Sequence, residues 1–298
     1  MRPVKIITDS CADLSAELLN KYDIDYAKMS VVCDGKEYPA VLTWSPADAH
    51  EMYETIRTGK RITTAQVSVD EFNTVFTKYL DEGFDIVYIG CSSKQSGSVN
   101  TANVVKQKLL ENRPEAQIFC IDSLNACYGE GMLAIEAAKL AKSGFDAENI
   151  SNSIIKIRKN VNEFATVHTL DHLRKAGRVS ATSAFFGNLM GVKPIIAADA
   201  FGAQAAYKKV KGRQAALKEI VNLLKENIQN SEEQIIYIAH SDCREDEVNL
   251  LAETVRREIP CKDIHIGLIG PIIGASVGPD AIGVWGFGKE VTFAAESN

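Results

Sequence analysis

Hydroxyl side chains gather just after the predicted strands in the first half of the chain. They are Thr8, Ser10, Ser92, Ser93, Ser96, Ser98 and Ser123, and Lys94 is the one cation close to them. Hydroxyl groups can donate hydrogen bonds to an oxygen-bearing ligand group such as a carboxylate. Any single one could instead serve as a helix N-cap, but one cap per helix would suffice. The set as a whole therefore predicts a binding site for an oxygen-bearing group.

Two further segments could contribute to such a site. The hydroxyl-rich segment 63–68 precedes a predicted helix without an obvious strand before it, so we interpret it as a loop that closes over the same crevice. The segment 270–279 is too rich in Gly and Pro for regular structure. It suits close backbone approach to a ligand or to another domain, or else a set of tight turns between strands.

The sequence pattern predicts that three strand–helix units position these residues. Each unit has a β-branched run, then a hydroxyl-rich loop, then a segment of helical period; the runs are Val4–Ile7, Ile86–Ile89 and Gln117–Ile121. Such alternation predicts a parallel sheet with helices on both faces. Ligands of such sheets bind beyond the carboxyl ends of the strands, which is where the hydroxyl groups lie. Asp34-Gly35 predicts a small hairpin insertion near residues 24–40.

The second half of the chain shows a different pattern of helices and strands, which predicts a separate α+β domain. At about 150 residues per domain, the 298 residues suggest two domains. We therefore expect an N-terminal α/β domain over residues 1–155 and a C-terminal α+β domain over residues 156–298.

Composition excludes several functional classes. The chain is 46% hydrophobic and carries 33 basic against 39 acidic residues, so its charge of −6 gives no overall positive field for nucleic acid. Neither a signal peptide nor a membrane span is evident, which predicts a cytoplasmic protein. The seven cysteines form no CxxC pair, so we expect reduced thiols, no zinc or other metal site and no cofactor.

Several segments resemble catalytic or nucleic-acid-binding patterns, and most of them have a plainer structural interpretation. The letters GxGxxA at 129–134 fall inside a helical pattern, where a dinucleotide site is not expected. A hydrolase using Ser96 would need a positioned base that the sequence does not indicate. The helix-turn-helix-like segment 170–192, with its basic residues, leaves open a DNA-binding or scaffold protein. We expect a non-catalytic protein.

Four segments taken in order resemble the DegV family. They are Thr8 to Leu14, Thr64 to Ser68, Ser92 to Ser98, and Leu170 to Pro194, and the resemblance runs from about residue 4 to 288. It implies a two-domain protein that encloses one long-chain fatty acid in a tunnel between the domains. It also implies that the protein is the binding subunit of a fatty acid kinase, presenting the carboxylate to a separate ATP-dependent subunit that makes an acyl phosphate. Transient contact with a membrane surface would fit this role.

The resemblance also assigns the ligand-binding residues. By motif, the carboxylate contacts fall on Thr64 and Ser96, with Ser276 nearby. The supporting positions of the ligand loops are Ser10, Thr63, Gly97 and Ser98.

The chain departs from the family pattern at several of these positions. Ser276 stands where the family usually has histidine, and Asp280 stands where it has the final glycine of that segment. Cys11 occupies a position where threonine is common, and Ala65 and Val67 replace the usual Ser and Pro. The head-group geometry should therefore differ from that of the family, because serine brings no positive charge.

Overall fold

The computed structural model describes residues 2–180 and 191–295, which form two compact units. Unit 1 comprises Met1–Thr43 and Thr64–Arg158, and unit 2 comprises Trp44–Thr63 and Lys159–Asn298. The division after Arg158 lies close to the expected domain boundary. Residues 44–63, in contrast, fall within the expected N-terminal domain but belong to unit 2.

Unit 1 is built on a four-stranded sheet with the order β2-β1-β6-β7, and every neighbouring pair is parallel. Its strands are β1 (Val4–Asp9), β2 (Ile24–Ala27), β6 (Asp85–Gly90) and β7 (Ile118–Asp122). Strands β1, β6 and β7 are those of the three predicted strand–helix units, so the predicted parallel sheet is confirmed. Strand β2 lies in the segment assigned to the hairpin insertion, yet it pairs with β1 as an edge strand of the main sheet.

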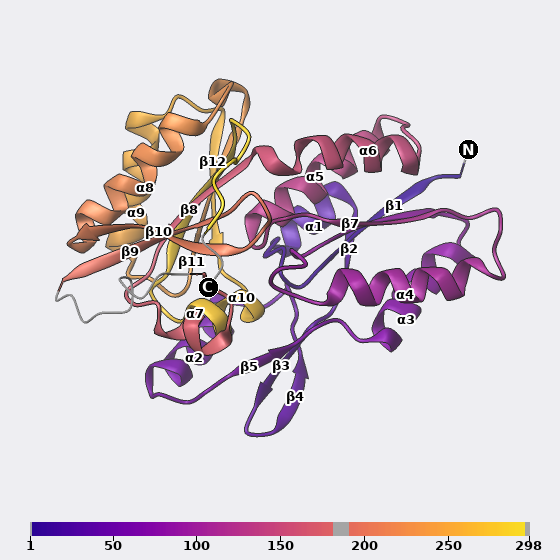
Figure 1. Cartoon of the computed structure of the whole chain (residues 1–298), viewed down its shortest axis with the longest axis horizontal. Helices are drawn as coiled ribbons and strands as arrows, with labels where there is room; N and C mark the ends of the chain where they lie inside the picture. Colours follow the sequence, from indigo (N-terminus) through magenta and orange to yellow (C-terminus); the bar gives the residue numbers. More distant parts are fainter. Residues whose placement is uncertain (1, 181–190, 296–298) are drawn as a thin grey trace. The chain divides into compact units, whose positions relative to one another are not determined.

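Helices cover both faces of this sheet (Figure 1). One face carries α3 (Val69–Asp81) and α4 (Ser98–Leu110), and the other carries α5 (Tyr128–Lys142) and α6 (Ala147–Ile157), with α1 (Ala16–Tyr22) packed against α5. The ring of Tyr88 on β6 lies 5.0 Å from that of Phe72 and 6.1 Å from that of Phe76, both on α3. Aromatic burial of this kind fixes α3 against the sheet.

A small second sheet in unit 1 includes the predicted hairpin. Strands β3 (Ser30–Cys33) and β4 (Lys36–Pro39) pair antiparallel around Asp34-Gly35. Both turn residues have positive φ, as a two-residue hairpin turn requires. The sheet order β4-β3-β5 shows that β5 (Thr63–Ala65), which we expected to be loop, adds a third strand.

The N-cap of α3 offers a direct test of the capping interpretation. Ser68 Oγ accepts a hydrogen bond from the Glu71 N–H at 3.0 Å. Ser68→Ala should lower the free energy of unfolding by about 1 kcal/mol, because it leaves a helix-end donor without its partner. Urea denaturation would measure this change. Ser68→Asp, which keeps an acceptor, should restore most of the stability, and an equal loss in both variants would contradict the capping role.

Unit 2 contains a six-stranded sheet with the order β10-β9-β8-β13-β11-β12. Its strands are β8 (Val161–Thr166), β9 (Val192–Ala198), β10 (Gln204–Lys211), β11 (Ile235–His240), β12 (Asp263–Leu268) and β13 (Ile282–Phe287). The β11–β12 pair is parallel, whereas the other pairs are antiparallel. Helices α8 (Arg213–Asn227) and α9 (Glu245–Glu258) bury their apolar faces in the core of this sheet. The predicted α+β arrangement of the second half is confirmed.

Packing explains why α2 (Pro46–Arg57) belongs to unit 2. Tyr53 and Ile56 are buried in a cluster that includes Leu268 at the end of β12. The Tyr53 hydroxyl donates to the Ile269 carbonyl at 2.7 Å. Ser45 caps the start of this helix through a contact three residues away, whereas the partner of Tyr53 lies more than two hundred residues further along the chain.

The segment 270–279 corrects one sequence expectation. It forms a helix, α10 (Pro271–Val277), instead of irregular turns. Pro271 occupies its first turn, where a missing N–H costs nothing, and Gly278 ends it with a φ of +77°. Gly274 is needed because a Cβ there would lie 2.3 Å from the Tyr53 hydroxyl.

The predicted helix-turn-helix over 170–192 is described only in part. Helix α7 (Asp171–Ala176) lies in it, but residues 181–190, which include most of the expected second helix, lie outside the described residues. In the described part of the chain, no helix has the length and apolar character needed to cross a membrane.

Candidate functional site

The two hydroxyl-rich loops that precede α3 and α4 are joined by hydrogen bonds within unit 1. Ser98, which is fully buried, accepts a hydrogen bond from the Val67 N–H at 3.2 Å, and its Oγ lies 3.0 Å from Ser96 Oγ. The segment that carries Thr64 is therefore fixed against the loop that carries Ser96. This contact brings the two predicted carboxylate-binding segments together.

Gln66 and Gly97 form a second link between these loops. Gln66 Nε2 donates to Thr101 Oγ1 of α4 at 2.7 Å, so the Gln66 side chain reaches across to the other segment. A Cβ at Gly97 would lie 2.0 Å from Gln66 Oε1, which shows how closely this amide covers the glycine. Gly97 thus permits the close approach of the two loops.

The joined loops present neutral hydrogen-bond donors, and Lys94, which is exposed, is the one cation in their sequence. The Thr64 and Ser96 residues are half-buried, and among the described residues none hydrogen-bonds to the Thr64 hydroxyl. Helix α4 begins at Gly97 without a side-chain cap, and its first turn holds no acidic residue. The positive end of a helix favours an anion. The arrangement can therefore hold a carboxylate through neutral hydroxyl groups and main-chain N–H groups.

Other hydroxyl groups from the predicted set serve the local structure instead. Ser10 is fully buried, donates to the Ala40 carbonyl at 2.7 Å and accepts from the Met29 N–H at 3.0 Å. Ser123 Oγ donates to the Asn125 carbonyl at 2.9 Å. These hydrogen bonds give both side chains a structural role, and the supporting part of Ser10 in the ligand loops stays a prediction.

The remaining predicted positions are placed as follows. Thr63 is exposed on β5, directly before Thr64. Ser276 is half-buried on α10 in unit 2, so its part in binding stays a prediction. Ser96 Oγ is hydrogen-bonded to the Ser98 hydroxyl and accepts from the Ser98 N–H. Neither group is a base, so these contacts offer no support for the hydrolase alternative.

A buried acidic pair below the β1 and β6 loops was not expected from the sequence. Asp9 ends β1 and Glu130 lies in the first turn of α5, and both are fully buried. Burial raises the pKa of Asp9, although hydrogen bonds from Tyr88 and two main-chain N–H groups oppose the shift. Burial, reinforced by the charge of Asp9, raises the pKa of Glu130 well above its usual value. The signal that could have revealed Glu130 is a single acid inside the otherwise apolar run 128–135.

Close packing explains why the GxGxxA pattern has glycine at positions 129 and 131. A Cβ at Gly131 would lie 2.7 Å from the Ala12 carbonyl oxygen, and one at Gly129 would lie 2.8 Å from Asn125 Oδ1. Both residues are inside α5, as predicted. They allow the helix to approach neighbouring main chain closely, which is a structural role.

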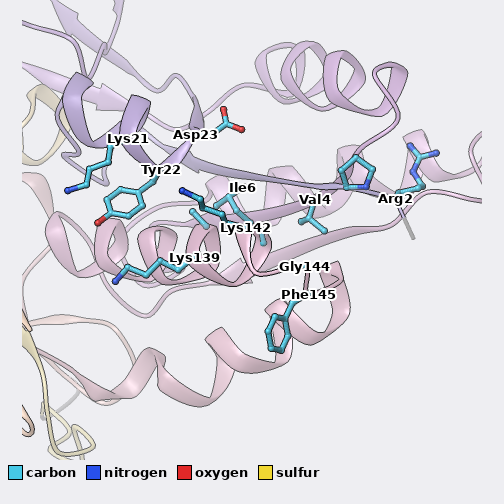
Figure 2. A pocket seen from close by; sticks show the side chains of 13 residues that line it. Arg2, Val4, Ile6, Lys21, Tyr22, Asp23, Lys139, Lys142, Gly144 and Phe145 are labelled. Carbon is cyan, nitrogen blue, oxygen red and sulfur yellow. The ribbon is translucent and has the colours of Figure 1, made fainter. Parts of the chain in front are cut away.

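A cavity of about 760 Å³ lies beside β1 and the ends of α1 and α5 in unit 1. Figure 2 shows that its lining combines the cations Arg2, Lys21, Lys139 and Lys142 with the ring of Phe145. None of its lining residues belongs to the two hydroxyl loops. It is therefore a basic surface pocket separate from the candidate head-group site.

The fold combines a parallel α/β unit, which has paired hydroxyl loops at the carboxyl edge of its sheet, with an α+β unit. The family model described as "Uncharacterised protein, DegV family" matches residues 3–288. The chain belongs to the DegV family, and the resemblance found in its sequence is confirmed.

Individual relatives agree with this assignment. A DegV domain-containing protein of Clostridium perfringens is 35% identical over 288 residues, which covers 97% of this chain and 98% of the relative. Two crystal structures from Thermotoga maritima are similar over nearly the whole fold. One, a DegV lipid-binding protein, is 27% identical with a TM-score of 0.84 and covers 97% of this chain and 100% of that chain. The other, reported to reveal a fatty acid binding function, is 26% identical with a TM-score of 0.82 and covers 96% and 99%.

Proposed function

We propose that this protein binds one long-chain fatty acid and holds its carboxylate with the hydroxyl groups of Thr64 and Ser96. The observation that carries the proposal is the pair of hydrogen-bonded loops that bring these two hydroxyl-rich segments together. The Thermotoga relative with fatty acid binding function supports the ligand class. The tunnel implied by the family resemblance stays a prediction.

Energetics support a ligand of this kind. Burial of ~15 methylene groups at about 0.8 kcal/mol each would contribute on the order of 10 kcal/mol before the costs of ordering. A carboxylate removed from water without donors would cost several kcal/mol, so it must meet hydrogen-bond donors. Hydroxyl groups and the N–H groups at the start of α4 supply them.

We further propose that the protein has no catalytic activity alone and presents the carboxylate to a separate ATP-dependent kinase subunit. Neutral donors support this role, because they hold the anion while leaving its oxygen nucleophilic. An arginine bound to both carboxylate oxygens would neutralise their charge and make them weaker nucleophiles toward the γ-phosphorus atom of ATP. The product would be an acyl phosphate.

Native mass spectrometry of the purified protein tests the ligand. We expect a species heavier than the chain by the mass of one long-chain fatty acid, and denaturing the protein should release that acid for identification. Delipidated protein should take up one palmitate or oleate. A protein that is empty as purified and rejects both acids would overturn the proposal.

A further inference from the structure

Two thiols and a carboxylate meet in the interior of unit 1, and none of the three belongs to the residues assigned to the fatty acid. Ligand atoms of Cys11, Cys91 and Glu130 all lie within 4.8 Å of one another. The side chains are almost completely buried, with exposed fractions of 2%, 1% and 0%. Cys11 Sγ also donates a hydrogen bond to Met29 Sδ at 3.4 Å.

The fold positions the two cysteines through a single carboxylate. Cys11 lies two residues beyond β1 and Cys91 directly follows β6, its parallel neighbour in the sheet. Asp9 Oδ1 accepts from the Cys11 N–H at 2.9 Å, and Asp9 Oδ2 accepts from the Cys91 N–H at 3.2 Å. Tyr88 donates to the same Oδ2 at 2.7 Å. Asp9 therefore fixes the main chain at both cysteines and holds the two strand ends in register.

The cluster concentrates acidic groups in the interior of unit 1. The charged groups that act most strongly on Cys91 and Glu130 are themselves acids, namely Asp9, Asp13 and Asp122. Glu130 Oε1 accepts from the Thr8 hydroxyl at 2.7 Å, whereas Oε2 is buried and has no hydrogen-bond partner among the described residues. Buried acids are ordinarily paired with a cation or bound to a metal.

We propose that Cys11, Cys91 and Glu130 bind one Zn²⁺ ion. Two sulfur ligands and one carboxylate oxygen are a ligand set that zinc accepts, and Zn–S bonds of ~2.3 Å place two sulfurs of a tetrahedral site roughly 3.8 Å apart. The observed spacing within 4.8 Å requires only a small contraction. Protons of the thiols and of the carboxyl group leave to solvent as the ion binds. A divalent ion is favoured over Cu⁺, because three acidic ligands and Asp9 surround it.

Such an ion would organise the fatty-acid head-group loop. Cys91 directly precedes the loop from Ser92 to Ser98, and Cys11 follows β1 on the neighbouring strand. Zinc would tie these two loops together below the hydroxyl groups. With three protein ligands the ion would keep one open position for a water molecule, and the ligands themselves are buried.

Metal content and spectroscopy test this site in the full-length protein. Protein expressed with added Zn²⁺ and purified without chelator should contain close to one zinc ion per chain, as measured by inductively coupled plasma mass spectrometry. Removal of the ion with a chelator under mildly denaturing conditions should lower Tm by several degrees. Co²⁺-loaded wild-type protein should show thiolate-to-metal charge-transfer absorption, which requires no variant to fold.

Variants separate this cluster from the other thiols. Cys11→Thr and Glu130→Gln should each lower zinc content at least tenfold, whereas Cys33→Ser and Cys261→Ser, whose thiols lie outside the cluster, should keep it. Metal-free wild-type protein after zinc loading would overturn the proposal. A Cys11–Cys91 disulfide in the non-reduced protein would also overturn it, as would binding of Cu⁺ alone without dependence on Glu130. Fatty acid uptake is measured separately, so failure of zinc binding leaves the ligand proposal intact.

Discussion

Thr64→Val should raise the Kd for palmitate by about 5- to 150-fold, equivalent to ~1–3 kcal/mol. The substitution keeps the branched shape and removes one of the two hydroxyl groups that we assign to the carboxylate, leaving that of Ser96. A carboxylate oxygen that has lost its contact with water and has no hydrogen-bond donor in the site weakens binding. Isothermal titration calorimetry on delipidated protein would measure the change.

Thr63→Val is the matched control for this measurement. Thr63 and Thr64 are neighbours in β5, and successive side chains of a strand point to opposite sides. Thr63→Val should therefore leave the Kd within about twofold of wild type, with its supporting role limited to the loop. Equal effects at both positions would assign the loss to the strand, and an unchanged Kd in Thr64→Val would remove the assignment of this hydroxyl.

Glu163→Gln should stabilise unit 2 at alkaline pH. Glu163 is buried on β8, where its two oxygens accept from Gln204 Nε2 at 2.5 Å and from Trp285 Nε1 at 3.2 Å. Burial raises the pKa of Glu163 to about 7, although both hydrogen bonds oppose the shift. The folded state therefore binds this proton more tightly than the unfolded state. Its contribution to stability is complete below the unfolded pKa of about 4.5 and is lost as pH rises to about 7.

The amide should remove this pH dependence. At pH 8 the free energy of unfolding of Glu163→Gln should exceed that of wild type by up to about 3 kcal/mol, and the difference should vanish near pH 4.5. The buried Oε1 atom of Gln204 has no hydrogen-bond partner among the described residues. If the Gln204 amide rotates, this oxygen can accept a hydrogen bond from the amide that replaces the Glu163 carboxyl group. Urea denaturation from pH 5 to 8 gives the curve. Glu233→Gln, at an exposed position, should follow wild type, and a constant difference across this range would refute the assigned titration.

Local patterns predicted most of the fold because the relevant forces act over a few residues. Hydrophobic period located β1, β6 and β7, and turn residues located the hairpin around Asp34-Gly35. They did not predict that α10 would be helical, because Gly and Pro normally disfavour helices. There, Pro271 sits in the first turn and Gly274 meets the ring of Tyr53, a partner distant in the sequence.

The sequence likewise predicted some features of the candidate site and missed others. Motif order located Thr64 and Ser96, and strand ends located their edge of the sheet. The hydrogen bond between Val67 and Ser98 depends on how two separate loops meet, so no sequence spacing could predict it. The Cys11–Cys91 cluster was overlooked for a related reason. Sequence rules for zinc look for neighbouring cysteines, whereas these two are brought together by adjacent strands.

The membership of α2 in unit 2 has a practical consequence for dissecting the protein. A fragment ending at Arg158 would retain α2 but lose Leu268 and the Ile269 carbonyl, leaving Tyr53 and Ile56 uncovered in water. Such a fragment would be prone to aggregation. A soluble excised version of unit 1 should instead replace residues 44–63 with a short flexible bridge, since the chain passes between the units at Thr43, Thr63 and Arg158.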